Sequence, residues 1–144
     1  MKKLIQVKEL EQCPCFNLRR MARELTNYYN KSLKLSGITS TQIPILALIN
    51  IFNQIETSKI ALLLNLEIST VRRNSSILIK KKLITIVRRN ANGNLLELTT
   101  NGFNKLREAL PIWKKSNQAF RKGDVKLAKL YQNMNIIHIL MADQ

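Results

Sequence analysis

Apolar residues recur at steps of three and four along the first quarter of the chain, which is the spacing of one face of an α-helix. This stripe consists of Phe16, Leu18, Met21, Ala22, Leu25, Tyr28, Tyr29 and Leu33. Pro14 suits the first turn of such a helix, because its missing N–H would have no partner there, and Gly37 suits a helix stop. The pattern predicts an amphipathic helix that begins near Pro14 and ends before Gly37.

The segment that follows predicts a second helix and then a pair of shorter ones. The capping-box spacing of Thr39 and Gln42 precedes the apolar run Ile43 to Phe52, which indicates a well-buried helix. A short helix from about Ser58 to Asn65, capped by Thr57, leads through a tight turn into another helix, which we expect to begin at Ser69. Two short helices joined by a tight turn are typical of a helix-turn-helix.

A change to β-branched and apolar residues marks the next element. The segments Leu83 to Arg89 and Leu95 to Leu98 are separated by an Asn-Gly turn signal, and together they predict a β-hairpin. A two-stranded wing after a helix-turn-helix completes a winged helix. The predicted fold is therefore mainly α with a small β-hairpin wing.

Two helices are expected after the hairpin. Thr99 or Thr100 caps a long helix that continues through Phe120, and Gly123 and Asp124 separate it from a last helix. The last helix has an apolar stripe made of Leu127, Leu130, Met134, Ile137 and Met141. Such a stripe needs a partner surface.

Composition narrows the class of partner. A net charge of +15 favours an anionic polymer or membrane, because so many like charges repel one another until they are neutralised. The length of 144 residues fits one domain. No window approaches the roughly 18 uninterrupted apolar residues of a membrane span, and polar residues interrupt the opening before a signal-peptide core could form. We expect a cytoplasmic, nucleoid-associated protein that binds nucleic acid.

The basic residues concentrate where the helix-turn-helix and the wing are predicted. Between Glu67 and Arg89 the single acid Glu67 is outnumbered by Arg72, Arg73, Lys80, Lys81, Lys82, Arg88 and Arg89. On a helix that begins at Ser69, Val71 and Leu78 point to the core. The residues left on or near the groove-facing side are then Thr70, Arg72, Arg73 and Ser76, and we give Ser69 and Thr70 phosphate or base-edge roles. An arginine there can bind guanine O6 and N7 together, so we predict that this helix binds DNA.

The basic residues beyond the groove-facing side have two interpretations. Arg88 and Arg89 are adjacent on a strand and face opposite ways, so only one of them easily meets the DNA backbone. Lys80, Lys81 and Lys82 end the reading helix, where cations bind phosphate or complement the helix dipole. Both roles stay open for the three lysines.

Cys13 and Cys15 are the candidates for thiol chemistry. They flank Pro14 at a helix start, where unpaired amides and nearby arginines favour a thiolate, so a redox switch and idle cysteines both stay open. Cys-x-Cys with no following pair is a weak metal signal, and the lone His138 resembles a packing residue. Neither a phosphate loop, a nucleophile elbow nor a carboxylate pair is present, so we expect no enzyme, cofactor or metal site.

The order of these elements resembles the MarR family of transcriptional regulators from about Cys13 to Phe120. The similar pieces are Leu18-Arg19-Arg20, Gly37-Ile38-Thr39, Ser69-Thr70-Val71-Arg72-Arg73-Asn74, Leu83-Ile84, Leu98-Thr99-Thr100-Asn101-Gly102 and Leu110-Pro111-Ile112-Trp113. The family motif places a base-contacting arginine at Arg73. Departures are a wing tip without the usual aspartate-x-arginine pair, Ser75 in place of an inward leucine, and Lys82 in place of a helix-ending glycine.

The resemblance implies an intertwined, triangular homodimer. Residues 1–36 and 100–144 would form the dimerisation helices, and residues 37–99 the DNA-binding lobe, with an effector cleft between lobe and stem. It also implies a transcriptional repressor on a near-palindromic operator, released by a small molecule or an oxidant. Two other classes stay open, namely a basic architectural protein that coats DNA with little sequence choice and a module that binds an acidic protein.

Overall fold

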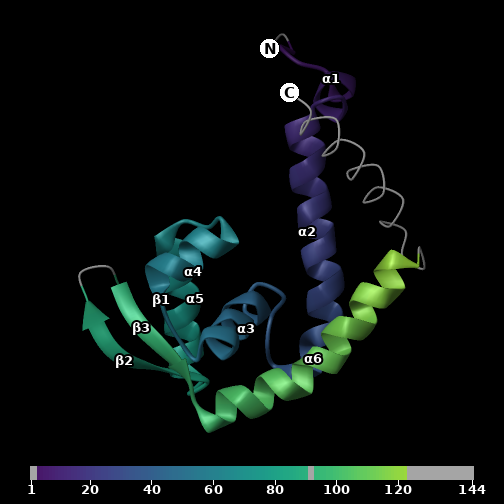
Figure 1. The fold of residues 1–144 in the computed structure, drawn as a ribbon. Helices are drawn as coiled ribbons and strands as arrows, with labels where there is room; N and C mark the ends of the chain where they lie inside the picture. The colour runs from purple at the N-terminus through teal and green to yellow at the C-terminus, as the bar shows by residue number, and fades with distance from the viewer. Residues whose placement is uncertain (1–2, 91–92, 123–144) are drawn as a thin grey trace, which may run out of the picture.

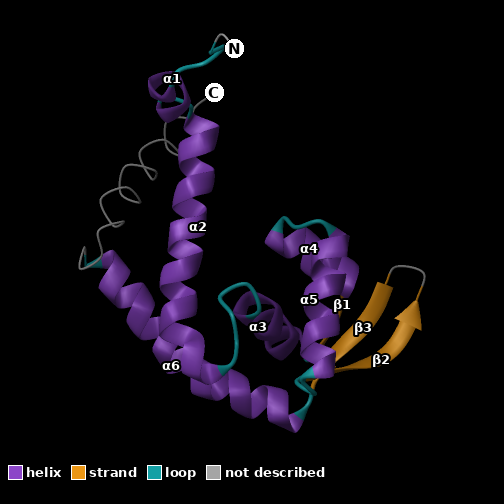
Figure 2. Ribbon diagram, turned by 180° about the vertical axis from the view of Figure 1, so that it is seen from behind, coloured by secondary structure: helices purple, strands orange, loops and turns teal. Residues whose placement is uncertain are grey.

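The computed structural model describes residues 3–90 and 93–122. Helices dominate, and the strands gather at one end of the molecule (Figures 1 and 2). In chain order the elements are α1 (Val7–Glu11), α2 (Pro14–Leu33), the 3-10 turn η1 (Lys34–Ser36), α3 (Ile43–Phe52), β1 (Gln54–Glu56), α4 (Thr57–Leu64), α5 (Ile68–Lys80), β2 (Ile84–Asn90), β3 (Gly93–Leu98) and α6 (Thr100–Arg121). The predicted mainly α fold with a hairpin wing is confirmed.

The lobe, residues 37–99, packs α3, α4 and α5 against a three-stranded antiparallel sheet of order β1-β3-β2. Ile55 of β1 pairs with Leu96 of β3, and Ile84 of β2 pairs with Leu98. Fully buried residues from these elements form one cluster, which includes Ile45, Leu46, Ile49, Ile60, Val71, Leu78 and Leu96. Each such side chain contributes roughly 1.5–3 kcal/mol by leaving water.

The stem consists of α2 and α6. Figure 1 shows α2 as a long rod that points away from the lobe, while α6 runs from the wing along the base of the lobe and on to α2. Tyr28 Oη donates to the carbonyl of Ser116 at 3.5 Å, and Tyr29 Oη donates to the Asn117 side chain. These bonds join the C-terminal half of α2 to α6.

Local chemistry explains where the long helices begin and end. Pro14 occupies the first turn of α2, and Gly37, with φ of +70°, follows the closing turn, as predicted. The Thr99 hydroxyl accepts the Gly102 N–H at 3.0 Å and so caps α6. A Cβ at Gly102 would stand 1.8 Å from the carbonyl oxygen of Leu83, so this glycine lets α6 begin directly against the residue before β2.

The predicted starts of α4 and α5 were wrong by one residue. Glu56, not Thr57, is the N-cap of α4, because the Thr57 hydroxyl instead accepts the N–H of Asn94 on β3 at 3.2 Å. Helix α5 begins at Ile68 and not at Ser69, and its N-cap is Glu67, whose side chain makes no capping bond. Thr57, which the sequence suggested as the cap of α4, therefore lies inside that helix.

Two short elements were not predicted. Strand β1 has three residues, and helix α1 has five. At the start of α1 the Glu9 carboxylate accepts the Gln6 N–H at 2.8 Å. Both are too short to produce a readable hydrophobic period. The predicted last helix and His138 lie outside the described residues. Among the helices that are described, none combines the length and the apolarity needed to cross a bilayer.

Candidate nucleic-acid interface

Helix α5 is anchored on one face and open on the other. Val71 and Leu78 are fully buried, as predicted, and Ser75 between them is also buried. The opposite face exposes Ser69, Arg72, Arg73 and Ser76, while Thr70 is half-buried. The structure therefore brings these five predicted residues together along one helix, with the two guanidinium groups in solvent.

Neither arginine is held by a neighbouring acid. The ion pairs found among the described residues are Arg20–Glu24 and Lys105–Glu108, both away from α5. The Asn74 amide donates to the Thr70 carbonyl at 3.0 Å and so stays along its own helix. Arg72 and Arg73 thus extend from a fixed backbone into solvent, where their planar donors can meet an external acceptor.

The three lysines after the reading helix have different surroundings. Lys80 is exposed. Lys81 Nζ donates to the Gly37 carbonyl at 2.8 Å, which ties the end of α5 to the segment before α3. Lys82 has φ of +57°, the left-handed conformation that glycine adopts most easily, and its carbonyl accepts the Thr99 hydroxyl at 2.7 Å. The backbone of Lys82 therefore makes the turn from α5 into the wing.

The wing continues from this turn. Its register shifts between Ile86 and Arg88, so Val87 is an extra residue in β2. Arg88 lies opposite Leu95, Arg89 lies opposite Asn94, and both arginines are exposed. The wing thus presents two further cations beside α5.

Gly93 lies where the wing comes into close contact with the start of α4. It has φ of +120°, and a Cβ there would stand 2.1 Å from the Thr57 hydroxyl oxygen. Only glycine fits this contact without displacing Thr57. Sequence analysis missed this role of Thr57, because its partners Gly93 and Asn94 lie more than thirty residues further along the chain.

The two cysteines lie far from α5. Cys13 is the half-buried N-cap of α2 and Cys15 is exposed in its first turn; both are free thiols. Figure 1 places this end of α2 beside α1, at the opposite end of the rod from the lobe. Three or more side chains suited to a metal ion do not gather anywhere in the part of the chain that the structure describes.

An open hollow of about 440 Å³ lies between the lobe and the stem. Its lining comes from four segments of the chain, namely Ala22, Leu25, Thr26, Tyr29, Ser40, Thr41, Pro44, Leu64, Leu66 and Trp113. Most of these side chains are apolar. Sequence analysis could not assign them, because no local pattern shows that α2, the turn after α4 and α6 meet here.

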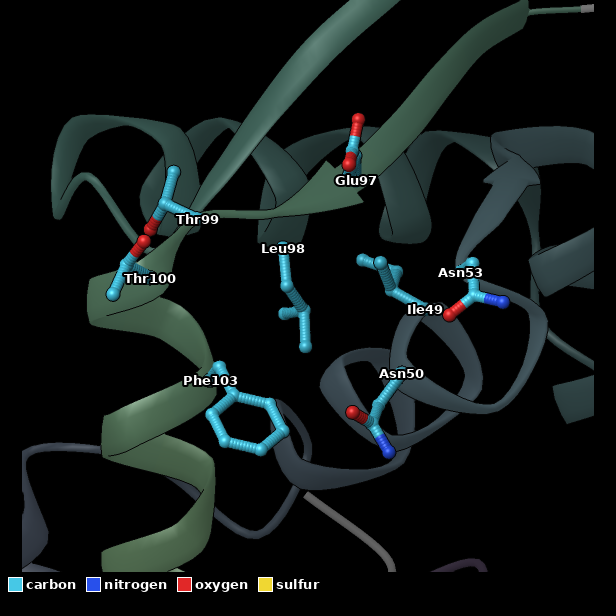
Figure 3. Close-up of a pocket in the computed structure, with 8 residues that line it drawn as sticks. All are labelled: Ile49, Asn50, Asn53, Glu97, Leu98, Thr99, Thr100 and Phe103. Carbon is cyan, nitrogen blue, oxygen red and sulfur yellow. The ribbon is translucent and has the colours of Figure 1, made fainter.

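A second hollow, of about 380 Å³, lies where α3, β3 and the start of α6 meet (Figure 3). Ile49, Leu98 and Phe103 form its apolar wall, and the amides of Asn50 and Asn53 lie at its rim. Asn53 ends α3 with φ of +60°. This hollow borders Thr99, the residue that also binds the Lys82 carbonyl.

Comparison with known proteins agrees with this architecture. The sequence itself matches no family model and no curated protein. Among solved structures, the transcriptional regulator MosR of M. tuberculosis superposes with a TM-score of 0.72 at 24% identity, over 94% of this chain and 99% of that chain. The structure of M. tuberculosis MosR in complex with DNA superposes with a TM-score of 0.69 at 28% identity, over 92% of this chain and 99% of that chain.

The PcaV transcriptional regulator from Streptomyces coelicolor, in complex with its natural ligand, gives a TM-score of 0.72 at 20% identity over the full length of both chains. These neighbours are MarR-family transcriptional regulators. The resemblance noted in the sequence is therefore confirmed at the level of the fold, with low sequence identity. By its structure, the chain has the winged helix-turn-helix fold of the MarR-like regulators.

Proposed function

We propose that the protein is a DNA-binding transcriptional regulator that reads its operator with α5. The observation that supports this most is the division of α5 into a buried face and an open face that carries Arg72 and Arg73. A helix of this kind enters the major groove, where an arginine fork discriminates guanine by about 1–3 kcal/mol per good pair. In this proposal Arg73 has the leading base-reading role.

The remaining cations position the lobe on the duplex. Lys80, Arg88 and Arg89 are exposed, and Lys80 with one of the two wing arginines would contact phosphates, which adds affinity without sequence choice. Ser69, Thr70 and Ser76 would bind phosphate or base edges near the start of α5. MosR, whose DNA complex has been solved, shares this fold at 28% identity.

The proposed active species is a homodimer that represses transcription from a near-palindromic site. Within the twenty residues of α2, only Leu33 is buried. Leu4, Ile5, Val7, Leu10 and Leu18 leave between 41% and 96% of their surface exposed. A second copy of the chain would cover this apolar surface and would set two reading helices about one DNA turn apart, ~34–36 Å.

The hollow between lobe and stem would bind a small, mostly apolar effector. It touches α2 and α6 of the stem as well as Leu66 before the reading helix, so an occupant would bias how the lobe is held. Cys13 and Cys15 would add an oxidant response at the far end of the stem. The protein acts by binding in this proposal and not as an enzyme.

Competition binding tests the proposal. Duplexes enriched from a random pool are labelled, and unlabelled random duplex is added at about 150 mM salt; a regulator holds its site by a factor of roughly 10³ or more. Arg73→Ala should remove this preference, whereas Lys80→Ala should weaken all sequences alike and lower the salt slope by about one unit. Equal competition by random duplex would instead indicate an architectural protein, and absence of retention a protein-binding module.

A further inference from the structure

The exposed face of α6 carries a row of cations that the reading helix does not explain. Its members are Arg107, Lys114, Lys115, Arg121 and Lys122, all exposed, and we call them the α6 basic stripe. At 3.6 residues per turn they fall within about 120° of the helix circumference and extend over about 22 Å. The buried side of α6, with Leu106, Ala109 and Phe120, faces the rest of the molecule.

The stripe lacks the compensating acids of an ordinary solvated helix. Glu108 is the single acid of α6, and its carboxylate is bound by Lys105 at 3.0 Å. None of the five stripe cations forms an ion pair with a described residue. Helix α2 likewise has one acid, Glu24, which pairs with Arg20 at 3.1 Å, but α6 carries more unmatched cations. Mixed signs are usual on a solvent-facing helix, so five unmatched cations in one row require another explanation.

Most of the net charge lies outside the lobe, +5 in residues 1–36 and +5 in residues 100–144. Residues 37–99 contain eight basic and three acidic residues, so the lobe contributes +5 of the net charge of +15. The remaining +10 lies in the segments before and after the lobe. A protein that met DNA only through α5 and the wing would leave this larger share without a counter-charge.

A second copy of the chain does not fit the stripe. The partner would bring equally basic surfaces, and burying unpaired cations against one another is strongly unfavourable. A nucleic-acid backbone fits better, since a duplex of about 22 Å carries about 13 phosphates. The stripe also lies on α6, whereas the reading residues lie on α5, which packs on α4 and β2.

We propose that the α6 basic stripe is a second phosphate-binding surface, which holds a duplex other than the one in the reading helix and so links two DNA segments. This goes beyond operator recognition and requires only that the lobe also binds DNA. The binding is electrostatic and independent of sequence. It weakens steeply with salt, because each phosphate contact adds about 0.9 to the salt slope.

A bridging assay with the full-length protein tests this. One duplex is fixed on beads, a second labelled duplex of unrelated sequence is added, and its retention is measured with increasing salt. The test variant combines Arg107→Gln, Lys114→Gln, Lys115→Gln and Arg121→Gln. The matched control removes the same charge from exposed positions on α2 and at the start of η1 by combining Arg19→Gln, Arg23→Gln, Lys31→Gln and Lys34→Gln.

Bridging should fall to background in the α6 variant and persist in the α2 control, while both keep the operator preference of the wild type. A variant with Lys and Arg exchanged at the four α6 positions should bridge normally, which separates charge from folding. Bridging that survives in the α6 variant, or is lost equally in the control, would overturn the proposal. Retention on phosphatidylglycerol vesicles that depends on the stripe, without DNA bridging, would assign the surface to membranes instead.

Discussion

The lobe and the stem differ in how much of their apolar surface is buried within the protomer. Every element of the lobe contributes to one closed cluster, in which Leu46, Ile49 and Ile60 are fully buried. Helix α2 is longer than any lobe helix, yet buries only Leu33. The cluster also includes Leu33 of α2 and Leu106 and Ala109 of α6, so the base of the stem shares the lobe core, whereas the rest of α2 stays open in the protomer. Binding to DNA and assembly can then be disturbed separately.

The largest effect is expected for a truncation inside the lobe. Leu46→Ala removes a fully buried side chain, and the free energy of unfolding should fall by about 2–5 kcal/mol because a cavity is left in a closed core. Urea denaturation followed by circular dichroism measures this. A loss below about 1 kcal/mol would show that the lobe core is looser than the contacts indicate.

The equivalent truncation in the stem should act on assembly. Leu18 is 41% exposed in the protomer, and Leu18→Ala should weaken self-association by roughly tenfold or more if a second copy covers it. Sedimentation over a range of concentrations measures the dissociation constant. Leu62→Ala, at a lobe residue that is 79% exposed, is the control and should leave the constant unchanged. Equal weakening by both variants, or no weakening by Leu18→Ala, would contradict an interface at Leu18.

A smaller effect is expected where the lobe core is imperfect. The Ser75 hydroxyl is buried and has no hydrogen-bond partner among the described residues. Ser75→Ala removes this unsatisfied group and should raise the free energy of unfolding by about 1 kcal/mol. Thermal denaturation would show the gain, and operator preference should not change. A loss of stability would mean that the hydroxyl makes a bond that the described residues do not provide.

The smallest effect is expected at the turn after α5. Lys82 has φ of +57°, a conformation that strains any residue with a Cβ, so Lys82→Gly should relieve strain. Glycine also gives the unfolded chain more freedom, which offsets part of this gain, and the free energy of unfolding should rise by about 0.5–1 kcal/mol. Lys82→Ala removes the same charge but keeps the strain, and it serves as the control in the same denaturation experiment. Identical results for both variants would contradict a role for the backbone conformation.

Sequence reasoning succeeded where a local rule decides the structure. Pro14 and Gly37 correctly delimit the first long helix and its closing turn, Thr99 caps α6, and the pattern of Val71 and Leu78 gives the buried face of α5. In these cases the information lies within a few residues of the feature. The prediction that Arg72 and Arg73 reach solvent follows from the same periodicity.

It failed where distant segments compete for the same group. Threonine is a residue type favoured at N-caps, but the Thr57 hydroxyl accepts the N–H of Asn94 in the wing. Lys81 reads as one of three equivalent cations, yet it binds the Gly37 carbonyl. Contacts between residues so far apart in the chain leave no periodic signal. The hollow between lobe and stem could not be predicted either, because its lining residues also come from distant segments.

Protection of guanine N7 from methylation tests the reading role of α5 most directly, because N7 lies in the major groove. With the wild-type protein on its selected duplex, we expect protected guanines in two half-sites about one turn apart, ~34–36 Å. With Arg73→Ala, one guanine in each half-site should lose protection while contacts of the DNA backbone persist. Unchanged protection in the variant, or no major-groove protection by the wild type, would contradict the account.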